Sequence, residues 1–393
     1  MAQIQGERLM ADLEALRRFG QAGSGVERTA LSTADIAARR WLCERLREAG
    51  LVPSMDRHGT VLGRPAAARA VLIGSHTDSV PNGGWLDGAL GVICGLEVAR
   101  TLGTGVDVVS FQDEEGTFLP CLGSRAFIGD LAEAEVAAAR SRDGTRLKAR
   151  LEAAALDGAP LRAEPGRHAG FLELHIEQGP VLEAAGLSVG VVSAIVGIRR
   201  WRIRAEGRAD HAGTTPMAMR RDAGAALVAF AARIAEGLVA AGGSTAAVWN
   251  IGWIDFRPGA ANVVPAEAEL GLEFRDEDPA VLDRIEAWLR RVLAADAMLS
   301  GEETTRITPT PMDARLIGLL ETAAAARGVP AMRLPSGAGH DAMILARAMP
   351  SAMLFVPSIG GRSHDPAEDT AEADLLRGCQ VLCDAAAALL RTA

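Results

Sequence analysis

The first third of the chain alternates short apolar runs with longer amphipathic stretches. Ser32 to Gly50 has apolar residues at helical spacing, a capping-box-like start and a terminal glycine, and this pattern predicts a helix. The apolar runs 70–74 and 106–111 predict buried strands, with a helix between them at 88–102. This alternation predicts an α/β domain with a largely parallel central sheet.

Both predicted strands end in polar residues. The segment SHTD (75–78) follows the first strand, and QDEE (112–115) follows the second. Sheets of this class bind ligands at the carboxyl ends of their strands. We therefore expect the functional site at this edge of the sheet.

The pattern changes at 198–206, where apolar and polar residues alternate as in a half-buried strand. The next elements predicted by periodicity are a helix (221–240), two strands (246–256 and 266–275), a helix (279–296) and a strand (304–310). The order β-α-β-β-α-β is the ferredoxin-like arrangement.

After Pro311 the α/β pattern resumes, with a helix at 314–327, a strand at 351–356 and a helix at 371–391. A chain of 393 residues is also long for one domain. We therefore predict a discontinuous α/β domain, 1–199 and 312–393, and an inserted α+β domain, 200–311.

Five of the seven histidines stand among the small, polar and proline residues that are typical of tight turns. They are His76, His175, His211, His340 and His364. Any one of them alone could be structural, but together with nearby carboxylates they favour a metal site. His58 and His168 lack such surroundings, and we expect them on the surface.

Histidine nitrogens and carboxylate oxygens that suit zinc, manganese or cobalt recur after the predicted strands. The candidate ligands are His76, Asp87, Glu115, His175 and His364, with Asp87 shared by two ions. Asp87 could instead cap the following helix, and the adjacent Glu114 and Glu115 could simply be solvated. No cysteine lies in these motifs, which argues against a thiolate zinc site.

Two further acidic residues have candidate roles beside these ligands. Asp78 and His76 share one face of an extended segment, so Asp78 could orient the imidazole or could bond the backbone of the turn. If Glu115 binds a metal, Glu114 is placed to hold a proton next to it.

Rival catalytic motifs are weaker. The one G-x-S-x-G match, around Ser188, follows a helix-like stretch and precedes a β-branched run, which reverses the context of a nucleophile elbow. No G-x-G-x-x-G run follows a strand and no P-loop sequence is present, which disfavours nucleotide chemistry.

Charge and cysteine usage narrow the partners and the compartment. The formal net charge is −9 and the sequence has no basic stripe, which argues against nucleic acid as a partner. The five cysteines have no framework spacing, which is typical of reduced thiols in a cytoplasmic protein. We see no signal peptide and no apolar run of about 18 residues, so we expect no membrane span.

The motifs GSHTDSVPNGGWLDGALGV, QDEEGTF, ELHIEQGPVLE, HAGTTPMAMRRDA and SHDPAED resemble, over nearly the whole chain, the hydantoinase/carbamoylase branch of the M20 metallohydrolases. That branch includes N-carbamoyl-L-amino-acid hydrolases, allantoate and ureidoglycolate amidohydrolases, and β-ureidopropionases. M20 peptidases differ, since they carry a Lys-Gly pair after the bridging aspartate and an acidic ligand at the position of His175. One departure from the family pattern is Thr60, where many relatives have asparagine.

The resemblance implies a di-metal α/β domain and an inserted lid domain that also mediates dimerisation. His76, Asp87 and His175 would hold one metal, and Asp87, Glu115 and His364 the other. Glu114 would be the general base, and Asp78 would orient a histidine.

The same resemblance places substrate-binding residues in both domains. They would be Gln178 in the α/β domain and His211, Asn262 and Arg275 in the lid. His211 would complete the site of the partner subunit and help to stabilise the oxyanion. For His340 and Asp341, which match a family signature, we expect only a supporting role.

These roles imply metal-dependent hydrolysis of the ureido bond of an N-carbamoyl amino acid, giving the L-amino acid, CO₂ and ammonia. Allantoate or ureidoglycolate would require the same chemistry. An N-acyl amino-acid hydrolase or dipeptidase is a weaker alternative because the Lys-Gly pair is missing. A non-catalytic binding protein is weaker because every ligand position and Glu114 are retained. We expect two divalent ions (Zn²⁺, Mn²⁺ or Co²⁺) per subunit of a homodimer.

Overall fold

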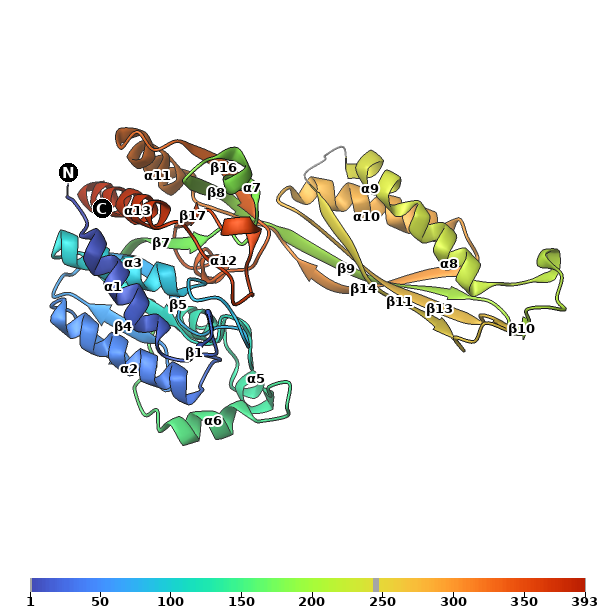
Figure 1. Cartoon of the computed structure of the whole chain (residues 1–393), viewed down its shortest axis with the longest axis horizontal. Helices are drawn as coiled ribbons and strands as arrows, with labels where there is room; N and C mark the ends of the chain where they lie inside the picture. The colour runs from blue at the N-terminus through green and yellow to red at the C-terminus, as the bar shows by residue number, and fades with distance from the viewer. Residues whose placement is uncertain (1, 243–246, 393) are drawn as a thin grey trace. The chain divides into compact units, whose positions relative to one another are not determined.

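The computed structural model describes residues 2–242 and 247–392. The chain divides into two compact units (Figure 1). Unit 1 comprises Met1–Ser193 and Met312–Ala393, and unit 2 comprises Ala194–Pro311.

A mixed nine-stranded sheet forms the centre of unit 1, in the order β15-β8-β17-β7-β5-β6-β4-β3, with β16 paired to β8. Its strands are β3 (Val52–Met55), β4 (Val61–Arg64), β5 (Ala70–His76), β6 (Val106–Phe111), β7 (His168–Ile176), β8 (Val189–Ile195), β15 (Thr310–Pro311), β16 (Ala331–Ser336) and β17 (Ser351–Val356). The four central strands β17, β7, β5 and β6 are parallel to one another. The carboxyl ends of these strands therefore meet at one edge of the sheet.

The prediction of a largely parallel sheet is wrong at both flanks, where β8 and the pair β3–β4 run antiparallel to their neighbours. The β3–β4 connection is a tight hairpin, which returns the chain in the opposite direction. Within it, Asp56 Oδ1 accepts backbone N–H bonds from His58, Gly59 and Thr60 at 2.9–3.0 Å. The turn therefore forms with threonine at position 60.

The central strands β5, β6 and β17 are buried along their whole length, so both faces of the sheet are covered. The helices of unit 1 are α1 (Gly6–Arg17), α2 (Thr33–Glu48), α3 (Ala89–Leu102), α4 (Leu122–Ile128), α5 (Glu133–Ala138), α6 (Leu147–Ala154), α7 (Val181–Ala185), α11 (Ala314–Ala326), α12 (Asp341–Leu345) and α13 (Glu372–Thr392). α3 and α13 pack on the parallel strands and on α1 and α11, while α4 and α12 form a second group. A short hairpin, β1 (Gln21–Ala22) and β2 (Gly25–Val26), follows α1.

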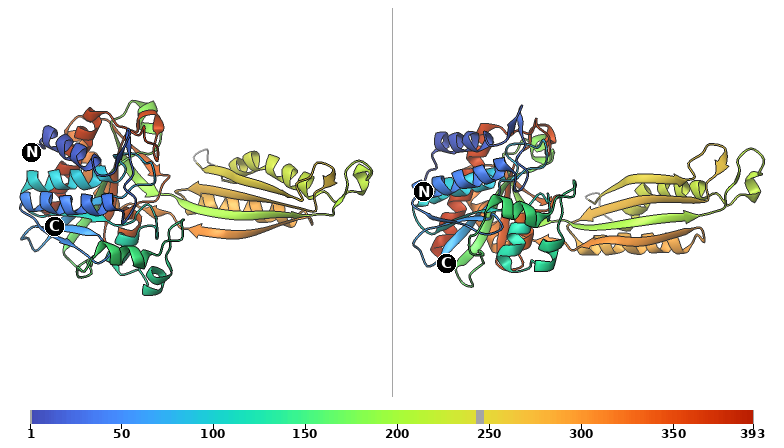
Figure 2. Two further views of the ribbon diagram at one scale, coloured as in Figure 1. Left: turned by 60° about the horizontal axis from the view of Figure 1, so that its bottom comes forward. Right: turned by 90° about the horizontal axis from the view of Figure 1, so that it is seen from below.

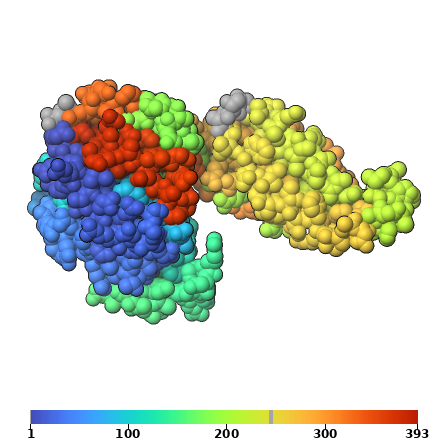
Figure 3. Space-filling model, viewed as in Figure 1, coloured from blue at the N-terminus to red at the C-terminus, as the bar shows by residue number. Residues whose placement is uncertain are grey.

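The last helix, α13, lies against the first residues of the chain in unit 1, and red and blue atoms adjoin in the space-filling view (Figure 3). The backbone N–H of Ile4 donates to Gln380 Oε1 at 3.2 Å, and Gln380 Nε2 donates to the carbonyl of Ala2 at 3.1 Å. α13 therefore closes the unit against its own N-terminus.

Unit 2 has a four-stranded antiparallel sheet in the order β11-β13-β9-β14. Its elements are β9 (Gly197–Glu206), α8 (Ala223–Ala232), α9 (Ile234–Gly242), β11 (Val248–Arg257), β13 (Glu267–Asp276), α10 (Pro279–Ala294) and β14 (Leu299–Ile307), with a small sheet of β10 (Asp210–His211) and β12 (Val263–Val264). The predicted helix 221–240 is two helices, and residue 246 of the predicted strand 246–256 lies outside the described residues.

The sheet of unit 2 has one apolar face, which the helices cover (Figure 2). Alternate residues of β9 and β13, such as Ile203, Leu272 and Phe274, are buried against apolar residues of α8, α9 and α10. The residues between them, such as Arg202 and Glu273, lie on the opposite face, as the two-residue period of a strand requires.

Within the described ranges, no single helix has the length and hydropathy needed to cross a membrane. The bent helix pair Ala223–Ala231 and Ile234–Gly242 has that length and hydropathy only when its two helices are taken together.

Candidate metal centre

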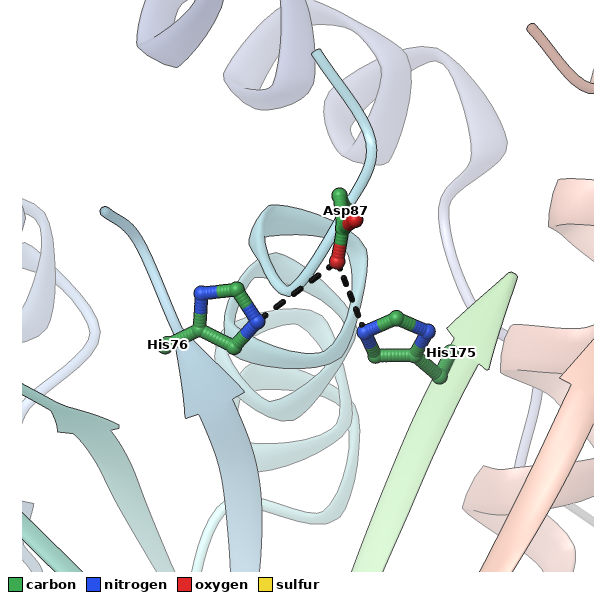
Figure 4. Close-up of side chains that lie close together, drawn as sticks. All are labelled: His76, Asp87 and His175. Carbon is green, nitrogen blue, oxygen red and sulfur yellow. Dashed lines mark ion pairs between the residues drawn. The ribbon is translucent and has the colours of Figure 1, made fainter. Parts of the chain in front are cut away.

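Two histidines from neighbouring parallel strands point toward one carboxylate (Figure 4). His76 ends β5, His175 is the penultimate residue of β7, and Asp87 lies just before α3. Asp87 Oδ1 lies 3.6 Å from His76 Nε2 and 3.1 Å from His175 Nε2. All three residues are buried, so the sheet edge holds them together out of bulk water.

Backbone carbonyl groups orient both imidazoles. His76 Nδ1 donates to the carbonyl of Asp78, and His175 Nδ1 donates to the carbonyl of Ile176, each at 2.9 Å. A carbonyl only accepts, so Nδ1 carries a proton in each ring, and Nε2 is the ring nitrogen that faces Asp87. Gly88 fits beside them because a Cβ there would lie 2.3 Å from His76 Nε2, and because its φ is +63°.

A second group of ligand atoms faces the other oxygen of Asp87. His364 Nε2 lies 3.4 Å from Asp87 Oδ2 and 3.4 Å from Glu115 Oε2. The ligand atoms of His76, Asp87 and His175, and those of Asp87, Glu115 and His364, lie within 4.8 Å of one another in each group. Asp87 therefore has the position of a carboxylate shared by two metal sites.

The charges of this cluster fit divalent cations. Burial raises the pKa of Glu114 well above its usual range and that of Glu115 to about 7, and the nearby carboxylate of Asp87 adds to this rise, although His76 opposes it. Glu115 Oε1 is buried without a hydrogen-bond partner among the described residues. A divalent ion would supply both the charge and the partner, and imidazole with carboxylate donors suits zinc, manganese or cobalt.

Glu114 lies at the centre without belonging to either ligand group. Its Oε2 is 3.7 Å from His76 Nε2, and its Oε1 is 4.0 Å from the Sγ of Cys121. The preceding residue, Asp113, has φ +55°, a conformation that non-glycine residues rarely adopt. The loop after β6 therefore directs both side chains into the same site, Glu114 beside His76 and Glu115 beside His364.

Asp78 contacts the centre in two ways. Its backbone carbonyl holds His76, while its carboxylate accepts from the backbone N–H groups of Asp113 at 3.0 Å and Glu115 at 3.3 Å. Arg39 Nη2 donates to the same carboxylate at 3.1 Å. The sequence left two roles open for Asp78, and the structure divides them. The Asp78 carboxylate bonds backbone N–H groups, and the Asp78 backbone carbonyl orients the imidazole of His76.

Comparison with known proteins identifies the family. The model of peptidase family M20/M25/M40 matches residues 72–388. The N-carbamoyl-L-amino-acid amidohydrolases of Paenarthrobacter aurescens and Geobacillus stearothermophilus are both 36% identical to this chain, over 97% and 96% of its length and 97% of theirs. The chain belongs to the M20 peptidase family. It is also similar to a solved amidase of the hydantoinase/carbamoylase family from Burkholderia phymatum, with 44% identity, a TM-score of 0.94 and coverage of 100% of this chain and 99% of the other.

Membership of the M20 family, whose members depend on metals, agrees with the ligand groups found at the sheet edge. This M20 chain is therefore a metal-dependent amidohydrolase.

A buried polar network lies behind the ligands of this M20 chain. The rings of His340 and His175 are 4.5 Å apart, and His340 Nε2 is 2.9 Å from Ser336 Oγ. Glu173 accepts from Ser75 Oγ at 2.6 Å and from the backbone N–H of Ala342 at 3.0 Å. Glu173, His175 and His340 also approach one another closely enough to hold an ion, but the partners of Glu173 and His340 are those of a supporting network.

Gln178 lies inside the metal centre. Its Nε2 donates to Asp87 Oδ2 at 2.9 Å and to Ser363 Oγ at 3.0 Å, and its backbone has φ +58°. The structure therefore places this predicted substrate-binding residue next to the shared carboxylate.

Unit 2 of the M20 chain separates the other three predicted substrate residues into two places. His211 and Asn262 are exposed and adjacent, since the backbone N–H of Ala212 donates to the carbonyl of Asn262 at 3.0 Å. Asn262 lies directly before β12 in the segment that leads to β13, whereas Arg275 is the penultimate residue of the ten-residue strand β13. A strand of this length spans roughly 30 Å, so His211 and Asn262 lie far from Arg275 within one chain.

Proposed function

We propose that this M20 chain hydrolyses the ureido bond of an N-carbamoyl-L-amino acid and releases the free amino acid, CO₂ and ammonia. The observation that carries the proposal is Asp87, whose two oxygens face separate ligand groups with Glu114 beside them. The names of the relatives agree with this reaction. Allantoate amidohydrolases from Bacillus subtilis and Escherichia coli are similar at 32% and 34% identity, so allantoate is the second candidate substrate.

We assign two divalent ions, Zn²⁺, Mn²⁺ or Co²⁺, to the centre. His76, Asp87 and His175 would hold one ion, and Asp87, Glu115 and His364 the other. Bound there, the ions would supply Lewis-acid activation of water and of the ureido carbonyl.

Glu114 is the residue that moves protons in the proposed reaction. Its carboxylate accepts a proton from the attacking water as oxygen bonds to the ureido carbon, and it returns that proton to the amino-acid nitrogen as the C–N bond breaks. The amino acid leaves as its amine, and the remaining carbamate decomposes to CO₂ and ammonia. Asp78 supports this step by holding the backbone on both sides of Glu114.

Arg275, Asn262 and Gln178 are assigned to the substrate carboxylate, and His211 to the oxyanion. Because His211 and Asn262 lie far from Arg275 in one chain, we propose that two chains build each site. Unit 2 would then act as lid and dimerisation domain, a role for which its exposed edge is suited.

Unit 2 leaves apolar side chains bare along the edge strand β11 and the adjoining helices. They include Val228, Val239, Val248, Trp249, Trp253 and Ile254, each with 39–57% of its surface exposed. An unpaired edge strand beside exposed apolar residues is typical of a protein interface. This edge supports a homodimer that pairs through unit 2.

Mixed dimers should show whether sites are shared between chains. When His211→Ala and Glu114→Gln chains are co-expressed, half of the dimers are hybrids and each hybrid has one intact site. We expect these inactive variants to regain up to about a quarter of wild-type turnover, as two-fold symmetry requires. Tandem affinity tags would isolate the hybrid, and turnover no greater than the sum of the two variants would reject the shared site.

Arg275→Ala should raise KM for carboxylate substrates by roughly 10- to 100-fold, which is the effect of losing a charge-assisted hydrogen bond. Arg275→Lys should recover only part of the loss, because lysine lacks the planar fork. Arg202→Ala removes a guanidinium from the same face of the sheet and serves as the control. An unchanged kcat/KM for Arg275→Ala would remove this residue from the substrate site.

The substrate assignment is tested by ammonia release from a panel of ureido compounds with metal-loaded protein. The panel contains N-carbamoyl-L- and D-amino acids, N-carbamoyl-β-alanine, allantoate and ureidoglycolate, with an N-acetyl amino acid assayed by acid release. Preference for the N-carbamoyl-L-amino acids supports the proposal, and preference for allantoate supports the second candidate. Silence on every ureido compound, with bound metal verified, would reject both.

The cysteines are consistent with the proposed cytoplasmic location. All five, Cys43, Cys94, Cys121, Cys379 and Cys383, are unpaired and buried. A reducing compartment keeps such thiols free.

A further inference from the structure

We propose that Glu368 is a positioning residue for the shared ligand Asp87, and that it controls how tightly the centre retains metal. This inference rests on the metal assignment of the proposed function. Glu368 belongs to the SHDPAED motif, four residues after the ligand His364. Its side chain lies behind Asp87 and belongs to no ligand group within the described part of the chain.

Glu368 holds the backbone at the shared ligand. Its Oε1 accepts from the backbone N–H of Asp87 at 3.0 Å and from that of Leu86 at 3.1 Å. These N–H groups precede α3, which begins at Ala89, so the helix provides no carbonyl for them. Glu368 is only 2% exposed, and without its carboxylate both N–H groups would be buried and unpaired.

A glycine makes room for this carboxylate. A Cβ at Gly84 would lie 2.0 Å from the carboxyl carbon and Oε1 of Glu368. The φ of Gly84 is not in the left-handed region, so a substitution there tests space rather than backbone strain. Substituting either Gly84 or Glu368 should therefore disturb the same hydrogen bond, the one from the Asp87 backbone N–H to Glu368 Oε1.

The loop that carries Glu368 contacts Asp87 from two sides. Ser363 Oγ donates to Asp87 Oδ2 at 3.3 Å, and His364 Nε2 lies 3.4 Å from that oxygen. Glu368 Oε1 accepts the backbone N–H of Asp87 itself. The hydrogen bond from the Asp87 backbone N–H to Glu368 joins residues that are 281 positions apart in the sequence. It therefore sets the separation of Asp87 and His364, two ligands of one proposed ion.

Such outer partners of metal ligands usually change metal affinity by about 10- to 100-fold when they are removed. We expect that loss for Glu368→Ala, and a comparable one for Gly84→Ala, which leaves the carboxylate present but displaced. Glu368→Gln retains an oxygen that can accept both N–H bonds, so its metal affinity should stay close to wild type. Asp313→Ala is the matched control, because Asp313 also bonds a backbone N–H, that of Leu316, at the start of a helix.

The measurement is Zn²⁺ affinity, by competition with a chelator, and bound metal per chain after dialysis, with folding checked by circular dichroism. Weakened binding in Glu368→Ala and Gly84→Ala, with rescue in Glu368→Gln, supports the proposal. Wild-type affinity in Glu368→Ala, or equal weakening in Asp313→Ala, would overturn it. If wild type binds metal but turns over no ureido compound, the proposed substrate fails while the role of Glu368 stands, since affinity is measured without turnover.

Discussion

Replacing Glu114 by glutamine is expected to lower kcat by about two to four orders of magnitude, the usual contribution of a general acid–base residue. Glutamine has nearly the same shape but cannot take up the proton. Glu114 is partly buried beside His76 and lies outside both ligand groups, so bound metal per chain should not change. The test is steady-state turnover of an N-carbamoyl-L-amino acid together with metal analysis of the same sample.

Two neighbouring substitutions separate this effect from others. Glu115→Gln should reduce metal content, because Glu115 Oε2 belongs to the second ligand group. Glu133→Gln, on the surface of α5, should change neither turnover nor metal content. Near-normal turnover by Glu114→Gln would show that protons move through another group.

Replacing Asp87 by alanine should abolish detectable turnover and reduce the binding of both ions. Its carboxylate faces His76 and His175 with one oxygen and His364 with the other, so its removal takes a ligand from each group. The three imidazoles hold the pKa of Asp87 well below its usual range despite burial, so the wild-type group is a carboxylate at neutral pH. Metal analysis after dialysis checks the expected loss.

Thermal unfolding gives a second readout for Asp87→Ala. A ligand at 100 times its Kd stabilises the folded state by about 2.7 kcal/mol. Chelation should therefore lower the Tm of wild type and leave that of Asp87→Ala unchanged. His364→Ala should lose one ion and keep part of the chelator effect, and retention of two ions by Asp87→Ala would contradict the shared-ligand assignment.

Local periodicity was sufficient to predict the elements that are buried along their whole length. The strands at 106–111 and 351–356 are buried throughout and have the predicted bounds. His76 and His175 follow from the same reasoning, since both stand at the ends of apolar strands that meet at one edge. Asp87 and His364 lie in loops with no periodic signal, and only their residue types and their turn-forming neighbours indicated them as ligands.

Antiparallel flanks and buried polar residues were not predictable in this way. The exposed four-residue strand β3 has too short a pattern to reveal its hairpin with β4. The expectation that His58 and His168 lie on the surface is wrong. His58 is 3% exposed, and the His168 ring is buried 2.9 Å from Asp107, a partner 61 residues away that no local pattern reveals.

Residues that support the site were missed for the same reason. Arg39 is fully buried and bonds Asp78, and only its spacing of four residues from Asp35 hinted at a role. Glu173 and Glu368 bond backbone groups 169 and 281 residues away. The presence of Glu368 in a ligand-bearing motif was the available signal for that residue.

The most direct test of the account is a metal titration of metal-free protein with an N-carbamoyl-L-amino acid as substrate. Amino acid and ammonia are measured at each step, together with bound metal. We predict no turnover without metal, equimolar release of the two products, and activity that saturates when two ions are bound per chain. Full turnover by protein verified as metal-free, or ions bound at the centre with no release of amino acid from any ureido substrate, would contradict it.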